Sequence, residues 1–161
     1  MRFSSLVFGV TILSRVAMAQ QISPRYELVK MSNNVNTFRH EAAPVVSPDG
    51  RTLYFFVQNH PENTMGKEDT QDIWVSAKDA DGVWSVARHM GSPFNLHRSN
   101  QVFTVFPDGQ LFIKGGSGRG DKGFSIVSGN SLQEVKVKDF KEMNKGRFYG
   151  ASMSADRKHI I

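Results

Sequence analysis

The sequence predicts an all-β fold: a partial β-propeller of about two four-stranded antiparallel blades plus the start of a third. Three observations predict it. A short phrase centred on an aspartate occurs three times, β-prone runs separated by turn residues lie between the copies, and these runs lack helical periodicity. Blades of a propeller repeat every ~40–50 residues and contain several short strands each. The repeated phrase therefore favours a propeller over other all-β architectures.

Each copy of the phrase places turn residues between two apolar runs. The copies are "EAAPVVSPDGRTLYFF" from Glu41, "SNQVFTVFPDGQLFIKG" from Ser99 and "RFYGASMSADRKHII" from Arg147. Asp-Gly between β-prone runs predicts a hairpin, because glycine adopts positive φ freely and aspartate tolerates turn geometry. In the third copy Arg157 stands where the glycine would be, so we expect a less comfortable turn or a turn of another type. The motif residues are Pro48, Asp49, Gly50, Pro107, Asp108, Gly109 and Asp156.

The copies set the expected domain boundaries. Residues 41–98 form the first predicted blade, residues 99–146 the second, and residues 147–161 an incomplete third. Each complete blade contains four β-prone runs. Trp74 and Trp84 are expected to pack blade against blade, and the alternative for this pair is a platform for sugar rings.

The N-terminus has the organisation of a secretory signal peptide. Arg2 precedes an apolar run, Phe3–Leu13, and Ala17–Ala19 supplies an A-x-A cleavage pattern. The alternative is a membrane anchor, but this run is too short to cross ~30 Å of hydrocarbon. We therefore predict that residues 1–19 are removed and that residues 20–40 are an N-terminal segment or linker.

This N-terminus also predicts where the protein resides. We expect an exported protein, in the periplasm or associated with the outer membrane of a Gram-negative bacterium, with no transmembrane segment in the mature chain. The absence of cysteine fits this location, since the chain has no disulfide, no thiol chemistry and no site for lipid attachment.

The charge pattern argues against nucleic acid as a partner. Basic residues exceed acidic ones across the whole chain, but they are dispersed, and the one cluster falls in residues 135–147. There Lys136 and Lys138 alternate with Val135 and Val137, which is typical of the solvated face of a strand.

A polar loop, Asn59–Asp72, is the candidate metal site. Asn63, Asp69 and Asp72 carry oxygen atoms of the kind that Ca²⁺ prefers, but their spacing matches no EF-hand. A solvated acidic loop is the favoured interpretation, and neither a metal nor another cofactor is predicted.

No catalytic residue is predicted. The sequence contains neither G-x-S-x-G nor cysteine. The segment Gly118–Gly123, "GRGDKG", matches G-x-G-x-x-G, but the run that follows it predicts a strand, whereas a dinucleotide site needs a helix there. No two histidines have the i, i+4 spacing of a helical zinc site. We therefore predict that the protein is not an enzyme.

The repeat also resembles a known family. "APVVSPDGRTLYFF" followed by "QDIWVSAKDADGVWSVARHMGSPFN" is similar to the WD40-like PD40 β-propeller repeat of TolB-like periplasmic proteins. The long polar loop and the order DIW, G-x-W, G-x-P-x-N resemble the propeller region of OmpA-family envelope proteins of Bacteroidetes. The resemblance covers Glu41–Ile161.

The resemblance implies a function by analogy of fold. It implies a non-enzymatic binding or scaffolding module that contacts envelope proteins, and peptidoglycan through a C-terminal domain outside this chain. Because a propeller ring closes with 4–8 blades, we also expect the chain to be a truncated fragment. The alternatives are the propeller domain of a secreted serine peptidase or hydrolase, and a TolB-like component of periplasmic transport.

Overall fold

The computed structural model describes residues 27–116, 122–140 and 149–161. The chain divides into two compact units, residues 1–30 and 31–161, and the described part of the first unit, residues 27–30, contains no strand. The predicted signal peptide lies outside the described residues.

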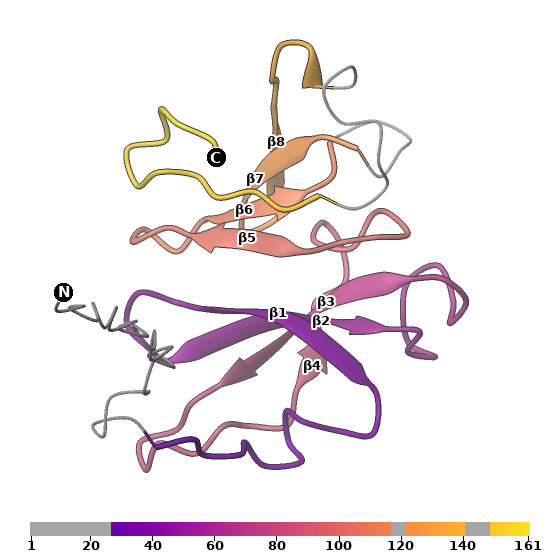
Figure 1. Cartoon of the computed structure of the whole chain (residues 1–161), viewed down its shortest axis with the longest axis vertical. Coiled ribbons are helices and arrows are strands. Elements are labelled where there is room, and N and C mark those ends of the chain that lie inside the picture. Colours follow the sequence, from indigo (N-terminus) through magenta and orange to yellow (C-terminus); the bar gives the residue numbers. More distant parts are fainter. Residues whose placement is uncertain (1–26, 117–121, 141–148) are drawn as a thin grey trace, which may run out of the picture. The chain divides into compact units, whose positions relative to one another are not determined.

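In the described residues, eight strands form two antiparallel sheets, which confirms the all-β prediction (Figure 1). In both sheets the strands lie side by side in the order of the sequence, so each sheet is a simple meander. The first sheet consists of β1 (His40–Val46), β2 (Thr52–Gln58), β3 (Gln71–Ala77) and β4 (Arg88–His89). The second consists of β5 (Val102–Val105), β6 (Leu111–Lys114), β7 (Phe124–Ser128) and β8 (Ser131–Val135). These are the two four-stranded blades of the predicted partial propeller.

The third copy of the phrase begins a further hairpin. Met153 pairs with Ile160, and the backbones of Ser152 and Ile161 exchange two hydrogen bonds of 2.8 and 2.9 Å. Met153 also donates its N–H to the hydroxyl of Thr104 on β5, at 3.1 Å. The start of the third repeat therefore lies on the second sheet.

Alternation along the strands distributes the apolar side chains over three clusters. The outer cluster, on one face of the first sheet, consists of Val35, Leu53, Phe55, Val57 and Trp74. The middle cluster, between the two sheets, consists of Ile73, Val102, Leu111, Ile113 and Val127. The third cluster, between the second sheet and the third copy, consists of Phe103, Phe106, Phe112, Phe124 and Met153. Sheets and third copy thus stack face to face, with a core in each gap.

The three turns of the phrase share the hydrogen bonds around their aspartates, although the second turn closes one residue earlier than the other two. The residue after each aspartate donates its N–H to the carbonyl two residues before that aspartate: Gly50 to Ser47, Gly109 to Phe106 and Arg157 to Ser154, at 2.8, 2.9 and 2.8 Å. Each aspartate accepts the N–H two residues further on, from Arg51, Gln110 and Lys158, at 3.0, 3.1 and 3.1 Å. The donor residue has positive φ in every copy, 73° at Gly50, 81° at Gly109 and 61° at Arg157. The third turn is thus of the same type as the others, and its arginine occupies a conformation that favours glycine.

Contacts with the second copy offset the backbone strain at Arg157. Its guanidinium pairs with Asp108 and donates to Gln110 Oε1 at 3.2 Å. The same group lies over the ring of Phe106, 4.3 Å from its centroid. The side chain that glycine lacks therefore binds the third turn to the second.

Within the described residues, no helix is long and apolar enough to cross a membrane.

Candidate functional site

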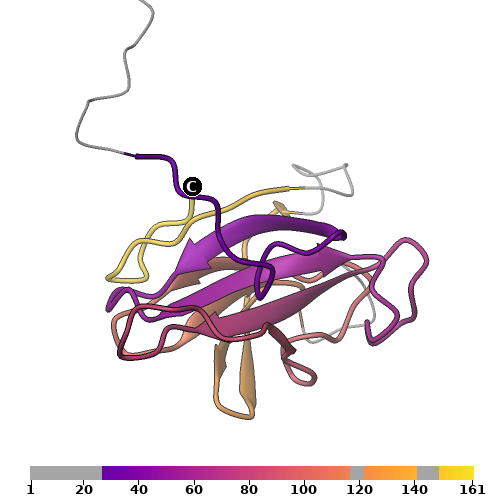
Figure 2. The same ribbon diagram turned by 90° about the horizontal axis from the view of Figure 1, so that it is seen from below.

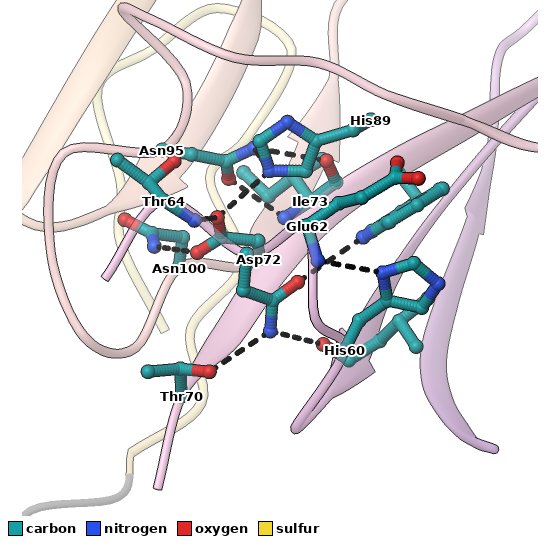
Figure 3. Close-up of polar contacts among 12 residues, drawn as sticks. His60, Glu62, Thr64, Thr70, Asp72, Ile73, His89, Asn95 and Asn100 are labelled. Carbon is teal, nitrogen blue, oxygen red and sulfur yellow. Dashed lines mark hydrogen bonds and ion pairs between the residues drawn. The ribbon is translucent and has the colours of Figure 1, made fainter. Parts of the chain in front are cut away.

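Buried polar side chains gather where the first sheet meets its connection to the second (Figure 3). The start of β3, the loop between β2 and β3, and the segment after β4 all contribute to this polar junction. Burial of polar groups costs several kcal/mol unless they are hydrogen-bonded. The residues of the polar junction are Asn63, Thr70, Asp72, His89, Asn95, His97, Ser99 and Asn100.

Asp72 is the centre of the polar junction. Its carboxylate is fully buried, and its Oδ2 accepts the N–H of Thr64 at 2.6 Å and Nε2 of His89 at 2.8 Å. Its Oδ1 accepts Nδ2 of Asn100 at 2.8 Å. Nε2 of His89 also lies 3.1 Å from Nδ2 of Asn95. Contacts from three segments thus compensate the burial of the Asp72 carboxyl group.

Asn95 takes the place of a strand residue beside β3. Its Oδ1 accepts the N–H of Ile73 at 2.7 Å, and its Nδ2 donates to the carbonyl of Ile73 at 3.0 Å. In the sequence, Asn95 is distinguished only as the last residue of the G-x-P-x-N pattern. Its position in that pattern was the one available signal for its role.

Asn100 and its neighbours join the connection to the first residue of β3. Asn100 donates its backbone N–H to the carbonyl of Gln71 at 2.8 Å, and Gln71 donates to the carbonyl of Arg98 at 2.7 Å. The side-chain Nδ2 of Asn100 also donates to the carbonyl of His97 at 2.6 Å. The connection between the sheets is therefore fixed along its length by backbone and side-chain bonds.

A lysine of the second sheet extends the polar junction. Lys114 on β6 is almost fully buried, and its Nζ donates to the hydroxyl of Ser99 at 2.7 Å. That hydroxyl donates in turn to Oε1 of Gln71 at 2.6 Å. The ammonium also lies 4.9 Å from the ring centroid of Tyr149. Nothing in the sequence pattern marked Lys114, since it occupies an apolar position of a strand.

The loop between β2 and β3 is exposed at its tip and anchored at its base. It forms the long magenta excursion at the right of Figure 2. The N–H of Asn59 donates to the carbonyl of Thr70 at 2.9 Å, and the hydroxyl of Thr70 donates to the carbonyl of Gly66 at 2.6 Å. Arg98 donates to the carbonyl of Glu68 at 3.0 Å. Met65 and the residues on either side of it remain exposed.

The structure places two of the three candidate calcium ligands inside the protein. Asn63 donates to the carbonyl of Val57 at 3.1 Å, and its Oδ1 lies 3.4 Å from Nε1 of Trp74. Both oxygens of Asp72 face protein donors, as described above, while Asp69 lies on the exposed part of the loop with a φ of 57°. Over the ranges that the structure describes, no three His, Asp or Glu side chains are grouped to hold a metal ion. The oxygen-rich loop therefore uses Asn63 and Asp72 for its own anchoring.

A groove of about 380 Å³ lies on the outer face of the first sheet. Phe55, Val57 and Trp74 form its apolar floor. The ring of His60 meets Trp74 edge-on, with centroids 4.4 Å apart, and its Nδ1 accepts the N–H of Glu62 at 3.1 Å. The remaining lining residues are Asn33, Asn34, Val35, Thr37, Phe38, Arg39, Glu41, Glu62, Val86 and Ala87.

Solvent exclusion lowers the pKa of His60, and the positive charge of Arg39 adds to the effect. The neutral ring suits its contacts, because Nδ1 acts as an acceptor.

The pKa of each turn aspartate is lowered, whereas burial alone would raise the pKa of a carboxyl group. The hydroxyl of Ser47 lowers the pKa of Asp49, the N–H of Gln110 lowers that of Asp108, and the hydroxyl of Ser154 lowers that of Asp156.

Both tryptophans lie on the outer face of the first sheet. Trp74 is buried in the outer cluster, and Trp84 packs against that cluster with the ammonium of Lys78 4.7 Å from its ring centroid. Asn34 donates to the carbonyl of Trp84 at 2.8 Å. The pair belongs to the face that points away from the second sheet, so its expected role between blades stays a prediction.

Comparison with protein-family models, with curated proteins and with solved structures finds no match to this chain. The resemblance to the PD40 repeat and the functions that it implies therefore stay predictions.

Proposed function

We propose that the chain is a non-enzymatic binding or scaffolding module of an exported cell-envelope protein, with other envelope proteins as its partners. The observation that supports this best is the anchored loop between β2 and β3. Loops that bind partners are exposed segments positioned by a rigid scaffold. Holding such a loop in one conformation before binding reduces the entropy lost on association.

The polar junction supplies this rigidity. Every buried side-chain nitrogen and oxygen in the described residues has a hydrogen-bond partner. Thr64, in the loop, bonds directly to Asp72, which is fixed by His89 and Asn100. These polar groups are engaged with one another inside the protein, whereas Met65, Lys67 and Glu68 are presented to solvent.

Binding to isolated envelope material tests the proposal. The purified chain is sedimented with outer-membrane vesicles and, separately, with peptidoglycan sacculi from a Gram-negative host. We expect retention by the vesicles, abolished when the vesicles are first treated with protease, and no retention by sacculi, because the proposed partners are envelope proteins. The triple variant Met65→Ala, Lys67→Ala, Glu68→Ala should lose about tenfold or more in retained protein, given the ~1–2 kcal/mol that each central interface side chain contributes.

Lys158→Ala, an exposed substitution in the third turn, is the matched control and should bind as the unmodified chain does. Absence of retention, or equal retention by the triple variant, would contradict the proposed loop. Turnover of a fluorogenic ester or peptide by the chain would favour the hydrolase alternative instead.

A further inference from the structure

Two histidines contact Trp74 at the base of the loop between β2 and β3. The ring of His60, in the loop, meets the indole edge-on with centroids 4.4 Å apart, and the ring of His89, on β4, meets it with centroids 5.4 Å apart. The indole donates in turn to Oδ1 of Asn63, at 3.4 Å. The base of the loop therefore contains two titratable rings around one tryptophan.

His60 holds the loop as a hydrogen-bond acceptor. Its Nδ1 accepts the backbone N–H of Glu62 at 3.1 Å, as Figure 3 shows. A backbone N–H only donates, so Nδ1 must carry a lone pair and the ring must be neutral. Protonation of the ring places a hydrogen on Nδ1, and the bond to Glu62 is then lost. This contact therefore exists only in the neutral form of His60.

His89 responds to acid in the opposite sense. Its Nε2 lies 2.8 Å from Oδ2 of Asp72, and the same oxygen accepts the N–H of Thr64 at 2.6 Å. Protonation of His89 adds a positive charge beside this carboxyl group, which strengthens the contact rather than breaking it. Acid therefore acts on the loop at Glu62 and leaves the attachment of Thr64 intact.

Charged groups from several segments face the ring of His60. Burial of the ring has the largest influence and lowers the pKa of His60 below its ordinary value of 6.5. Arg39, which precedes β1, and His89, on β4, also lower this pKa, whereas the carboxylates of Glu62, in the loop, and Glu41, on β1, raise it. A protonated ring that leaves the indole regains water and keeps the attraction of these carboxylates.

The position of the ring is therefore linked to pH. The released ring binds a proton more readily than the ring held against the tryptophan, so protonation shifts the equilibrium toward release. The held position is fully favoured above the ordinary pKa of 6.5 and loses stability as the pH falls toward the lower pKa of the held ring. The sign is the same as for the lost hydrogen bond, since both oppose a charged ring in the held position.

We propose that His60 is a pH-sensitive latch on the loop between β2 and β3. At neutral pH the ring holds residues 60–62 through the N–H of Glu62. In mildly acidic solution the protonated ring leaves Trp74, and this part of the loop opens while Thr64 stays bonded to Asp72. The consequence for partner binding rests on the function proposed above, because the same loop would bind envelope proteins, and a loosened loop loses more entropy on association.

Amide hydrogen exchange followed by NMR tests the latch in the full chain without a partner. Histidine titrations fall between about pH 5 and about pH 8. Across this range, the protection of the Glu62 amide, corrected for its intrinsic exchange rate, should fall about threefold or more on acidification, and that of Thr64 should not. The midpoint should coincide with the titration of the His60 ring in the same samples, and not with that of His89.

Two substitutions distinguish the latch from a general loosening of the chain. His60→Phe keeps a ring for Trp74 but offers no acceptor, so the Glu62 amide should exchange rapidly at every pH in this range. His159→Gln, at an exposed position of the third copy, is the matched control and should respond as the unmodified chain does. Protection of Glu62 that is independent of pH, a loss shared equally by Thr64, or a pH response that persists in His60→Phe would each overturn the proposal.

Retention by outer-membrane vesicles measures the consequence for binding. The unmodified chain should be retained about twofold or more less well near the acidic end of the range, and His60→Phe should be retained equally at both ends. Retention of the unmodified chain that is independent of pH would contradict the regulatory role of the latch. No retention at any pH would contradict the proposed function instead, while the exchange at Glu62 would still decide whether the latch exists.

Discussion

The two sheets share one strand order, but they differ in the contacts that supplement the apolar packing against their neighbours. The first sheet is joined to its connection by buried polar groups around Asp72. The second sheet is joined to the third copy by aromatic rings, and the ring of Phe124 lies 4.7–6.0 Å from those of Phe103, Phe112, Phe140 and Tyr149. The repeat therefore determines the backbone, while the side chains between repeats are free to specialise. A polar contact is directional and fixes a loop, whereas apolar packing chiefly contributes stability.

The largest effect on the free energy of unfolding is expected from the aromatic residues of the third cluster. Phe112 on β6 is fully buried in the third cluster. Phe112→Ala should lower the free energy of unfolding by ~3–5 kcal/mol, because it removes transfer energy and leaves a cavity. Urea denaturation measures the change. Phe38→Ala, at a site that is 90% exposed, should change it by ~0.5 kcal/mol or less, and a similar loss in both variants would show that the third cluster is not a core.

Disruption of the polar junction should lower the free energy of unfolding by less, and it should also change amide hydrogen exchange. Asp72→Asn places an amide where Thr64 and His89 both donate, and should cost ~2–3 kcal/mol of unfolding free energy. Amide hydrogen exchange should also quicken at Thr64 and not on β6. Glu68→Gln, at the exposed tip of the same loop, is the control. If exchange at Thr64 were unchanged, the polar junction would not be what anchors the loop.

The turns should show a smaller effect, which differs between copies. Gly50 has a φ of 73° with open space where a Cβ would be, so Gly50→Ala should cost ~1 kcal/mol through backbone strain alone. Arg157→Gly removes strain of similar size but also the contacts with Asp108 and Phe106, so its net effect should be within ~0.5 kcal/mol. Thermal unfolding of both variants measures the difference. Equal destabilisation by the two substitutions would mean that strain at Arg157 is negligible.

The smallest effect is the pH response of His60. Its pKa is lowered in the folded chain, so the unfolded chain binds the proton more readily. Stability should therefore fall as pH drops below 6.5, the ordinary value, and level off below the folded-state pKa. His60→Gln should make the profile shallower over this range. Because the ring is partly exposed, the change is modest, and an identical profile for the variant would assign the pH response to other groups.

The sequence was sufficient for features that depend on local chemistry. Asp-Gly between apolar runs located the first two turns, and alternation located the strands, since both properties act over a few residues. Of the two expectations for the third turn, a less comfortable turn or a turn of another type, the first agrees with the positive φ of Arg157. Its compensation was not foreseen, because Asp108 and Phe106 belong to another copy of the repeat.

The candidate site was harder to predict for a physical reason. Asn63 and Asp72 carry oxygen atoms suited to a metal ion, but Asp72 bonds to His89 and Asn100, which lie far along the chain. Asn63 instead bonds to Thr70 of its own loop and to Trp74. Asn95 and Lys114 are buried polar residues whose roles exist only after the two sheets are connected. A pattern of residue types cannot distinguish a polar side chain that binds a ligand from one that binds a distant backbone.

The contacts of Arg157 imply an order in which the repeats fold. A turn that uses glycine adopts positive φ without strain, whereas the strain at Arg157 is offset by its contacts with Asp108, Gln110 and Phe106. The second hairpin therefore acts as a template for the third, and the third should be the last to form and the first to open. If the repeats fold in this order, damage to the third hairpin would detach that hairpin without unfolding the two sheets that precede it.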